Sequence, residues 1–375
     1  MKICIWTGPA WEPWGPQSID SGGIGGSETA CVHTASQLAK LGHEVDTFGQ
    51  HDQCEGLYDG VRYFHFKRAV ENRKLLDADV WISSRDKNAI KLEPNARLKI
   101  LWAHDVHCGE DWDGSLLKFD SIFCLSKWAA ETFAGFYPHR KNLRDKIWVT
   151  QNGIDTSRYR SIFKIPFEIN GGIPKFFYSS APDRGLEVLL NMWPKIREIR
   201  SDAELHVYYG FDTWKKMVEK SPSKVTSLRI AWFVEKLKSL ADMGVYYHGR
   251  VGQRELAQAQ LDSVLWLHPT AFAETSCITA MEAQAAGAVP VTTRLAALAE
   301  TVKHGILLDG PNTAESYEAG FLGMVRGLLG PSNGLRLELA SKGRQWALAE
   351  CDWSTVAKKW DTFFKEKLEK LEKMP

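Results

Sequence analysis

Short apolar runs alternate with helical patterns along most of this chain, and this alternation limits the folds that it can adopt. In the first half we expect strands at 2–7, 44–48, 61–66, 79–83, 98–103, 121–125 and 147–150. In the second half we expect strands at 175–179, 204–209, 244–248, 264–268, 289–293 and 306–308. Helical stretches at 28–41, 127–136, 185–200, 212–219, 254–261 and 275–286 lie between some of them. This order is typical of parallel sheets covered by helices and predicts an α/β fold.

The alternation breaks once, near residues 158–174, where a stretch containing Gly and Pro has the composition of a linker. A chain of 375 residues exceeds one comfortable hydrophobic core and suggests two domains. We therefore predict two doubly wound, Rossmann-like domains that face one cleft, at residues 1–165 and 170–350, followed by a helical tail at 351–375.

The tail carries apolar residues that recur every three or four positions. These residues are Val356, Trp360, Phe363, Phe364, Leu368 and Leu371. Such a stripe predicts packing against a domain. Peripheral contact with a membrane is the weaker interpretation, because the polar face mixes Glu with Lys rather than being purely basic.

Composition argues against several classes of protein. The formal net charge is +1, so there is no global field to recruit nucleic acid, and we expect no nucleic-acid partner. No apolar run reaches the ~18 residues of a membrane span, and the first residues suggest a strand rather than a signal peptide. Seven scattered cysteines without paired spacing indicate reduced thiols and a cytoplasmic protein.

Two glutamates stand out between residues 264 and 293. Glu274 falls in a loop after the apolar run at 264–268, and Glu282 falls inside an Ala-rich helix that stops at Gly287. A strand–loop–helix unit opens a helix N-terminus at the carboxyl end of a sheet, where anionic ligands bind. The two carboxylates would flank these free N–H groups, an arrangement that suits a polyhydroxylated ligand with a phosphate. A helix with one exposed Glu and one loop Glu is the alternative interpretation.

The same stretch resembles the motif of the retaining glycosyltransferases of family 4, which have the two-domain glycosyltransferase-B (GT-B) fold. The matching positions are Pro269-Thr270, Glu274, Glu282, Ala283, Gly287 and Pro290-Val291. The resemblance implies that Glu274 holds hydroxyls of a donor sugar and that Glu282 holds the nucleotide ribose. It also implies that backbone amides at Ser276, Cys277 and Ile278 contact the sugar and the diphosphate.

A glycine loop at 21–27 precedes the first long helical pattern and resembles the Gly-Gly loop that follows the first strand in this family. The resemblance implies contact with the donor diphosphate or the acceptor at Gly22, Gly23, Gly25 and Gly26. Glycines let a backbone approach a ligand closely, and Ser27 could cap the helix. An ordinary flexible loop is the alternative, and the spacing does not fit a dinucleotide fingerprint.

Cleavage of a sugar–nucleotide bond leaves a diphosphate, whose growing charge needs cations and oriented amides. Arg184, just before Gly185, resembles the Lys of the loop that binds the diphosphate in this family. The family's Arg, five positions earlier, is replaced by Ser179. Arg250 could compensate from another strand end. The alternative for Arg184 is a solvated residue at a helix start.

The first half offers further candidates for the site. The apolar run at 98–103 ends in His104-Asp105, and the family carries a His at this place near the donor sugar. Asp105 could orient His104 or an acceptor hydroxyl, although lone histidines are usually structural. Trp11 and Trp14 lie in a Pro- and Gly-rich loop and could stack on an acceptor sugar. The sequence at 111–113 matches Asp-x-Asp only superficially, and the resemblance implies no metal.

Together these motifs occur in family order over nearly the whole chain. They predict a retaining, metal-independent glycosyltransferase without a cofactor other than its nucleotide-sugar co-substrate. The resemblance places the donor on the second domain and a glycan or small hydroxyl acceptor on the first, onto which the tail helix packs back. The alternatives are a nucleotide-sugar epimerase or phosphorylase of the same fold and a binding protein without turnover. The base, the sugar and the acceptor stay open.

Overall fold

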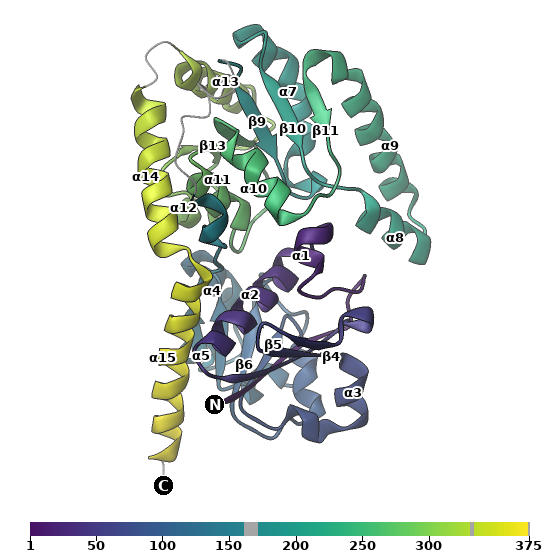
Figure 1. Ribbon diagram of the computed structural model, residues 1–375, viewed down its shortest axis with the longest axis vertical. Helices are drawn as coiled ribbons and strands as arrows, with labels where there is room; N and C mark the ends of the chain where they lie inside the picture. The colour runs from purple at the N-terminus through teal and green to yellow at the C-terminus, as the bar shows by residue number, and fades with distance from the viewer. Residues whose placement is uncertain (161–171, 331–333, 374–375) are drawn as a thin grey trace. The chain divides into compact units, whose positions relative to one another are not determined.

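The computed structural model describes residues 1–160, 172–330 and 334–373 (Figure 1). Two compact units divide the chain. The first consists of Met1–Ile19, Ile24–Gly153 and Asp352–Pro375, and the second of Asp20–Gly23 and Ile154–Cys351. The linker expected at 158–174 lies largely outside the described residues.

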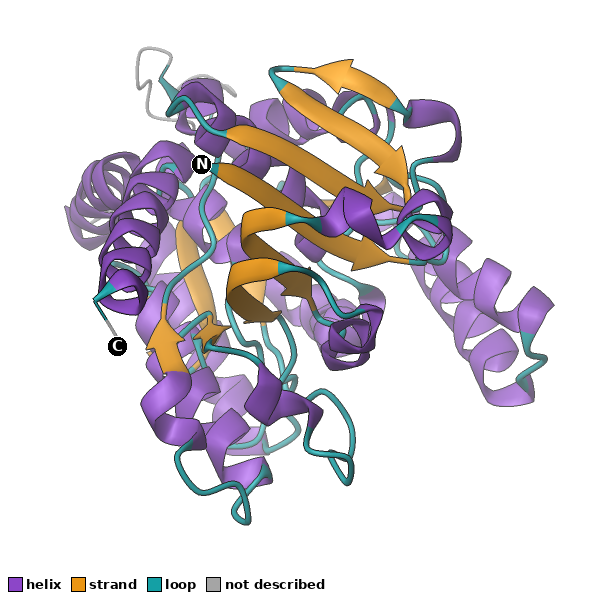
Figure 2. Cartoon of the chain, turned by 90° about the horizontal axis from the view of Figure 1, so that it is seen from below, coloured by secondary structure: helices purple, strands orange, loops and turns teal. Residues whose placement is uncertain are grey.

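The first unit contains an eight-stranded sheet in the order β3-β4-β2-β1-β5-β6-β7-β8 (Figure 2). Its strands are β1 (Lys2–Gly8), β2 (Glu44–Gly49), β3 (Gly56–Tyr58), β4 (Val61–His65), β5 (Ala78–Ser84), β6 (Ala96–Ala103), β7 (Ser121–Cys124) and β8 (Ile147–Val149). All neighbours pair in parallel except β3 and β4, which are antiparallel. At the centre, Ile3 of β1 pairs with Val45 and Val80, and all three side chains are buried. Both faces of such a sheet are covered, which explains the nearly continuous apolar runs.

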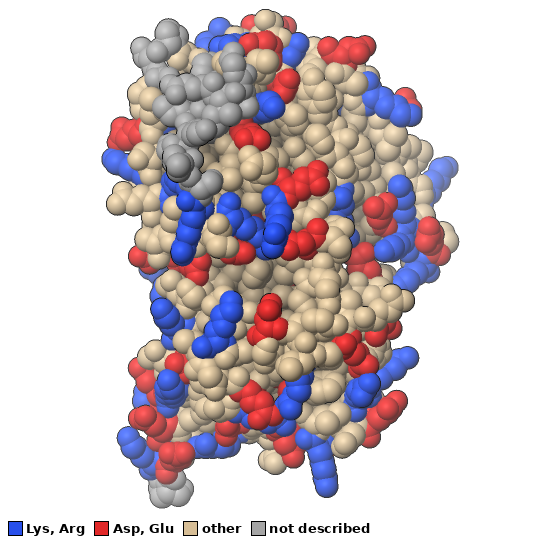
Figure 3. Space-filling view, viewed as in Figure 1, with Lys and Arg blue, Asp and Glu red and all other residues tan. Residues whose placement is uncertain are grey.

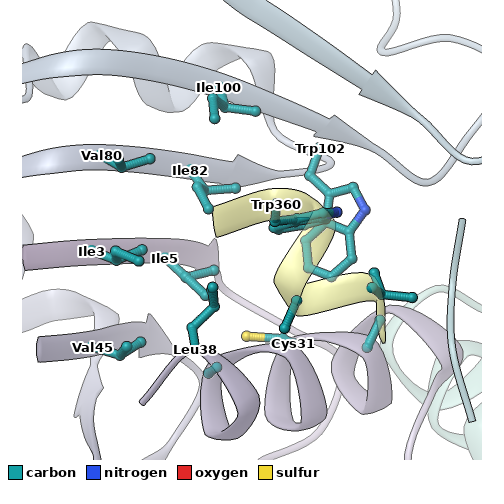
Figure 4. Close-up of a cluster of buried hydrophobic side chains, with 14 of the residues drawn as sticks. Ile3, Ile5, Cys31, Leu38, Val45, Val80, Ile82, Ile100, Trp102 and Trp360 are labelled. Carbon is teal, nitrogen blue, oxygen red and sulfur yellow. The ribbon is translucent and has the colours of Figure 1, made fainter. Parts of the chain in front are cut away.

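Helices of both chain ends contribute to the first unit. They are α2 (Gly26–Lys40), α3 (Phe66–Glu71), α4 (Lys127–Phe136), α5 (Leu143–Lys146) and α15 (Trp353–Glu372). α15 packs on α2 and β6, and its Trp360 ring lies 4.7 Å from that of Trp102 (Figure 4). The Trp360 ring also lies 4.9 Å from that of Phe123. The apolar stripe of the tail is therefore part of the first-unit core, except for its last member, Leu371, which is exposed.

The second unit contains a six-stranded, all-parallel sheet in the order β11-β10-β9-β12-β13-β14. Its strands are β9 (Lys175–Tyr178), β10 (Glu204–Val207), β11 (Val245–Tyr247), β12 (Leu265–His268), β13 (Val289–Thr293) and β14 (Ile306–Leu308). Its helices include α7 (Leu186–Ile199), α8 (Asp212–Lys220), α9 (Lys224–Ser239), α10 (Gln253–Leu261), α11 (Ile278–Ala286), α12 (Leu298–Thr301), α13 (Glu315–Leu329) and α14 (Gly334–Glu350). The α/β class and the two Rossmann-like domains with parallel sheets are thus confirmed.

Some elements were not expected from the sequence. The short antiparallel β3 and the helices α9, α13 and α14 had no counterpart among the expected ranges. The N-terminal half of α9 carries apolar residues on its exposed side, which obscures the periodicity that marks a helix. Within the described residues, no helix combines the length and the apolar character needed to cross a bilayer.

Candidate functional site

Two loops of the second unit meet beyond the carboxyl ends of β9 and β12. One loop runs from β9 through a short 3-10 turn at Pro182–Arg184 into α7, and the other runs from β12 through Pro269 to α11. They touch at Gly185, where φ is +109° and an added Cβ would lie 2.4 Å from the Pro269 carbonyl oxygen. Only glycine fits so close a passage, and this passage places Arg184 beside the second loop.

Arg184 and Glu274 form an ion pair across these loops. The Arg184 Nη1 donates to Glu274 Oε1 at 2.8 Å, and the guanidinium lies 3.2 Å from the centroid of the Phe272 ring. Burial raises the pKa of the Glu274 carboxyl, while the charge and hydrogen bond of Arg184 oppose the rise. The pair therefore holds a carboxylate and a cation, the two groups needed for sugar hydroxyls and phosphate oxygens, in one place.

The helix that follows begins without a side-chain cap. Cys277 is the N-cap of α11 and makes no capping hydrogen bond with its side chain. It is buried, whereas Ser276 and Ile278 are half-buried. Burial raises the pKa of the Cys277 thiol well above its usual value, which keeps it neutral. The positive end of the α11 dipole thus lies a few residues after Glu274, at the place expected for a diphosphate.

Glu282 lies one turn into α11 and is buried. Its Oε2 accepts a hydrogen bond from Gln260 Nε2 at 3.1 Å, and Gln260 Oε1 in turn accepts one from the Tyr159 hydroxyl at 2.6 Å. Burial raises the pKa of the Glu282 carboxyl, opposed by the Gln260 hydrogen bond and the charge of Arg158. Gln260 and Tyr159 were not expected from the sequence, because nothing in their local pattern links them to Glu282.

His268 is a further polar residue that the sequence reasoning missed. It ends β12, directly before Pro269, and its ring stacks on that of Trp266 at 4.6 Å. Among the described residues, neither ring nitrogen of His268 nor the buried Ser179 hydroxyl has a hydrogen-bond partner. Burial, assisted by the charge of Arg184, lowers the pKa of His268 to about 3, so the ring is neutral. The sequence signal that could have identified His268 is a histidine at the end of an otherwise apolar strand.

Arg250 lies in the loop after β11, half-buried beside Gly210. The distance between its Cβ and an added Cβ at Gly210 would be 3.3 Å, so the two loops at the ends of β10 and β11 pack tightly here. Arg250 therefore follows a strand end of the second unit, as Arg184 does. Its expected role at the diphosphate stays a prediction.

The glycine loop leads into α2. Gly25 is the N-cap of α2 and Gly26 its first residue, so Ser27 lies within the helix and is not its cap, contrary to expectation. An added Cβ at Gly25 would lie 2.3 Å from Glu28 Oε2, and the Ser27 hydroxyl donates to the same carboxylate oxygen at 2.9 Å. Gly23 has φ +70°, a conformation that favours glycine. The backbone conformation thus accounts for glycine at position 23, whereas the close contact at Gly25 involves only the movable end of the Glu28 side chain.

His104 and Asp105 follow β6 in the first unit. The His104 ring lies 4.4 Å from that of Trp102, and burial together with the charge of Arg85 lowers its pKa to about 3. Asp105 pairs with Arg85 at 2.9 Å, and Arg85 also donates to Ser27 Oγ at 3.3 Å. Arg85 has φ +68°, which is strained for a non-glycine residue. Arg85 therefore joins the start of α2 to the end of β6, a link that the sequence did not reveal.

The two tryptophans proposed for the acceptor differ in exposure. Trp11 is exposed, whereas Trp14 is only 1 % exposed. The Trp14 ring packs edge-on against His51 at 4.4 Å, and the Trp14 amide donates to the Gln50 carbonyl. The expectation for Trp14 was wrong, because a ring enclosed by the core cannot stack on a sugar. Trp11 stays a prediction.

The Asp-x-Asp sequence is engaged in ion pairs. Asp111 is buried and pairs with Arg140 at 2.9 Å and with Lys87 at 3.5 Å, and Asp113 pairs with Lys91 at 2.6 Å. Across residues 1–160, 172–330 and 334–373, no group of three or more His, Cys, Asp or Glu is placed to hold a metal ion.

A model of one known protein family matches part of this chain. Residues 175–325, which carry the Arg184–Glu274 pair and α11, match the model of the family "Glycosyl transferases group 1". No curated protein matches the sequence of this chain.

Solved structures resemble the fold over nearly its full length. Sucrose-phosphate synthase from Thermosynechococcus elongatus is 14 % identical and has a TM-score of 0.70, with 97 % of this chain and 98 % of that chain covered. HepE of Anabaena, solved with UDP-glucose, is 13 % identical with a TM-score of 0.69 and coverage of 98 % and 100 %. The catalytic domain of starch synthase IV from Arabidopsis thaliana, bound to ADP and acarbose, is 12 % identical with a TM-score of 0.71 and coverage of 98 % and 99 %. At such identities the similarity concerns the fold. The chain therefore has the GT-B fold, and its residues 175–325 match a glycosyltransferase family.

Proposed function

We propose that this protein is a glycosyltransferase that moves a sugar from a nucleotide-diphosphate sugar to a hydroxyl of a glycan or small acceptor, with retention of the anomeric configuration. The observation that carries the proposal is the Arg184–Glu274 pair beside the uncapped start of α11. It combines an acceptor for sugar hydroxyls with a cation and amide dipoles for phosphates. The nucleotide sugar and ADP named for the similar structures support a donor of this class.

In the proposed reaction, the bond between the anomeric carbon and the diphosphate oxygen breaks while a bond to the acceptor oxygen forms on the same face. The acceptor proton passes to the departing diphosphate. Arg184 and the first amides of α11 stabilise the charge that grows on this leaving group. Glu274 accepts hydrogen bonds from the donor sugar and Glu282 from the ribose. His104 of the first unit contacts the donor sugar in this proposal.

The proposal includes a reaction that needs no divalent metal, because Arg184 and the helix dipole supply the positive charge at the phosphates. It also places the protein in the cytoplasm and away from nucleic acid. The seven cysteines are all free thiols, a state that fits a reducing compartment.

A direct test offers radiolabelled UDP-, GDP- and ADP-sugars with mixed glycan acceptors, with and without EDTA. We expect labelled product from one donor class, unaffected by EDTA, whose new linkage has the donor's anomeric configuration by NMR. Glu274→Ala should lower kcat by roughly 100-fold, whereas Glu282→Ala should mainly weaken nucleotide binding. Inverted product, loss of activity in EDTA or full activity in both variants would each refute the corresponding part of the proposal.

A non-catalytic nucleotide-sugar-binding protein is the second candidate, and the observation in its favour is Ser179. This uncharged, half-buried serine stands where the resembled family has a diphosphate-binding Arg. Binding of a nucleotide sugar by calorimetry, without product from any acceptor, would favour this candidate. Conversion of the donor without an acceptor would instead indicate an epimerase.

A further inference from the structure

The outer side of α9 exposes a stripe of large apolar side chains. Val225 is 78 % exposed, Leu228 61 % and Trp232 36 %. At 3.6 residues per turn these three positions fall on one side of the helix, within about 60° of one another. Phe233 and Leu237 are buried and belong to the second-unit core. The helix is therefore apolar on the side that packs and again on part of the side that faces solvent.

The segment that carries this stripe is rich in basic residues. The segment from Asp212 to Ser239, which holds α8 and α9, contains seven Lys or Arg and only three Asp or Glu. The whole chain has a net charge of +1, so the remainder of the chain is net negative. Figure 3 shows basic and acidic side chains together at the right-hand edge, where Figure 1 places α8 and α9. We call the exposed side of these two helices the α8–α9 surface.

We propose that the α8–α9 surface binds the surface of an anionic lipid bilayer. Val225, Leu228 and Trp232 would enter the boundary between headgroups and acyl chains, while Lys and Arg of the same segment contact anionic headgroups. The aromatic ring of Trp232 suits that boundary, because its body is apolar and its N–H is polar. This inference does not depend on the donor or the acceptor of the proposed reaction.

Charge decides against the other occupants of such a surface. A second copy of the chain would bring the same basic excess against itself in a two-fold contact, which repulsion disfavours. A neutral apolar partner would gain nothing from the basic excess of this segment, seven Lys or Arg against three Asp or Glu. An anionic bilayer satisfies both the apolar stripe and the basic excess of the segment.

The test measures co-sedimentation of the full chain with vesicles of phosphatidylcholine alone or mixed with phosphatidylglycerol. We expect binding only to the anionic vesicles, and weaker binding in high salt. The triple variant Val225→Ser, Leu228→Ser and Trp232→Ser should bind roughly tenfold more weakly. Circular dichroism and thermal melting check that the variant is folded.

A matched control removes the same three residue types from exposed positions of the first unit. Val70→Ser, Leu57→Ser and Trp112→Ser alter side chains that are all more than half exposed, Trp112 by 85 %, and should leave vesicle binding unchanged.

A second variant keeps the inference testable if the apolar variant does not fold. Charge reversal at Lys215, Lys224 and Lys238 should abolish the preference for anionic vesicles. Equal binding to neutral vesicles, or equal loss in the matched control, would overturn the inference. So would a dimer, detected by light scattering, that the apolar substitutions dissociate.

Discussion

Gly185 is the residue on which the approach of the two site loops depends most directly. Gly185→Ala would place a Cβ 2.4 Å from the Pro269 carbonyl oxygen, on a backbone with φ +109°. The steric overlap and the backbone strain act in the same direction, so we expect the free energy of unfolding to fall by about 2–4 kcal/mol. Urea denaturation measures this change.

Gly323→Ala, in the middle of α13, is the matched control. No atom lies within 4 Å of an added Cβ at Gly323, and its backbone is helical. Alanine should therefore raise the free energy of unfolding by about 0.5–1 kcal/mol. Equal destabilisation by the two substitutions would show that close approach is not the reason for the glycine at 185.

Glu274 links stability to pH. Its folded pKa is raised by burial, so the folded protein binds this proton more tightly than the unfolded chain does. The resulting stability is complete below the unfolded pKa and is lost as the pH rises through the folded pKa. The side chain of the Glu274→Gln variant has no carboxyl that can ionise. The variant should therefore melt at the same or a higher temperature at neutral pH, despite losing activity. Melting temperatures of both proteins over pH 4–8 test this, and a variant that is markedly less stable at pH 7 would contradict it.

For single residues, the sequence predicted which residues belong to the candidate site better than it predicted their hydrogen-bond and ion-pair partners. Glu274, Glu282 and Arg184 were found because their spacing lies within one continuous motif. Gln260 and Arg85 were not found, because each is distant in sequence from its partner and is brought to it only by folding. Trp14 was misjudged because a Pro- and Gly-rich loop suggests exposure, whereas its ring fits against His51 in the core.

At the scale of elements, Trp360 is one of the buried side chains that anchor α15 in the first unit. This side chain is fully buried between Trp102 and Phe123, and its Nε1 donates to Thr150 Oγ1 at 2.8 Å. Trp360→Ala should reduce the free energy of unfolding by about 3–5 kcal/mol, because it leaves a cavity and removes the hydrogen bond. Leu371→Ala, at a partly exposed position of the same helix, should cost much less, and denaturant titration compares the two. A similar loss at both positions would argue that α15 contributes through its whole length instead.

Elements were predictable where burial imposes a regular pattern. The central strands are covered on both faces, so their apolar runs are continuous and easily recognised. α15 shows its period because only one of its sides is buried. The pattern fails for α9, whose apolar residues point both into the core and into solvent, and for the three-residue β3 at the sheet edge.

At the scale of the whole molecule, each unit has its own sheet and its own buried core. If the donor binds the second unit, a nucleoside diphosphate at a hundred times its Kd should stabilise that unit by about 2.7 kcal/mol. Amide exchange in β12 and β13 should slow, as followed by hydrogen–deuterium exchange mass spectrometry. Amides of β1 and β5 are the internal control, because their protection depends on the first core. Equal slowing in both sheets would contradict a nucleotide site confined to the second unit.

The hydrogen bond from Gln260 to Glu282 has a consequence for the kind of nucleotide that the protein accepts. With Oε2 already engaged, and Gln260 held by Tyr159, the role proposed for Glu282 leaves the ribose to be recognised chiefly through Oε1. A deoxyribose lacking the matching hydroxyl would leave a buried carboxylate oxygen short of a donor, at a cost of about 1–3 kcal/mol. Competition between a nucleoside diphosphate and its 2′- and 3′-deoxy analogues would measure this discrimination. The hydrogen bond from the Gln260 amide to Glu282 would thus make the protein select ribonucleotides over deoxyribonucleotides.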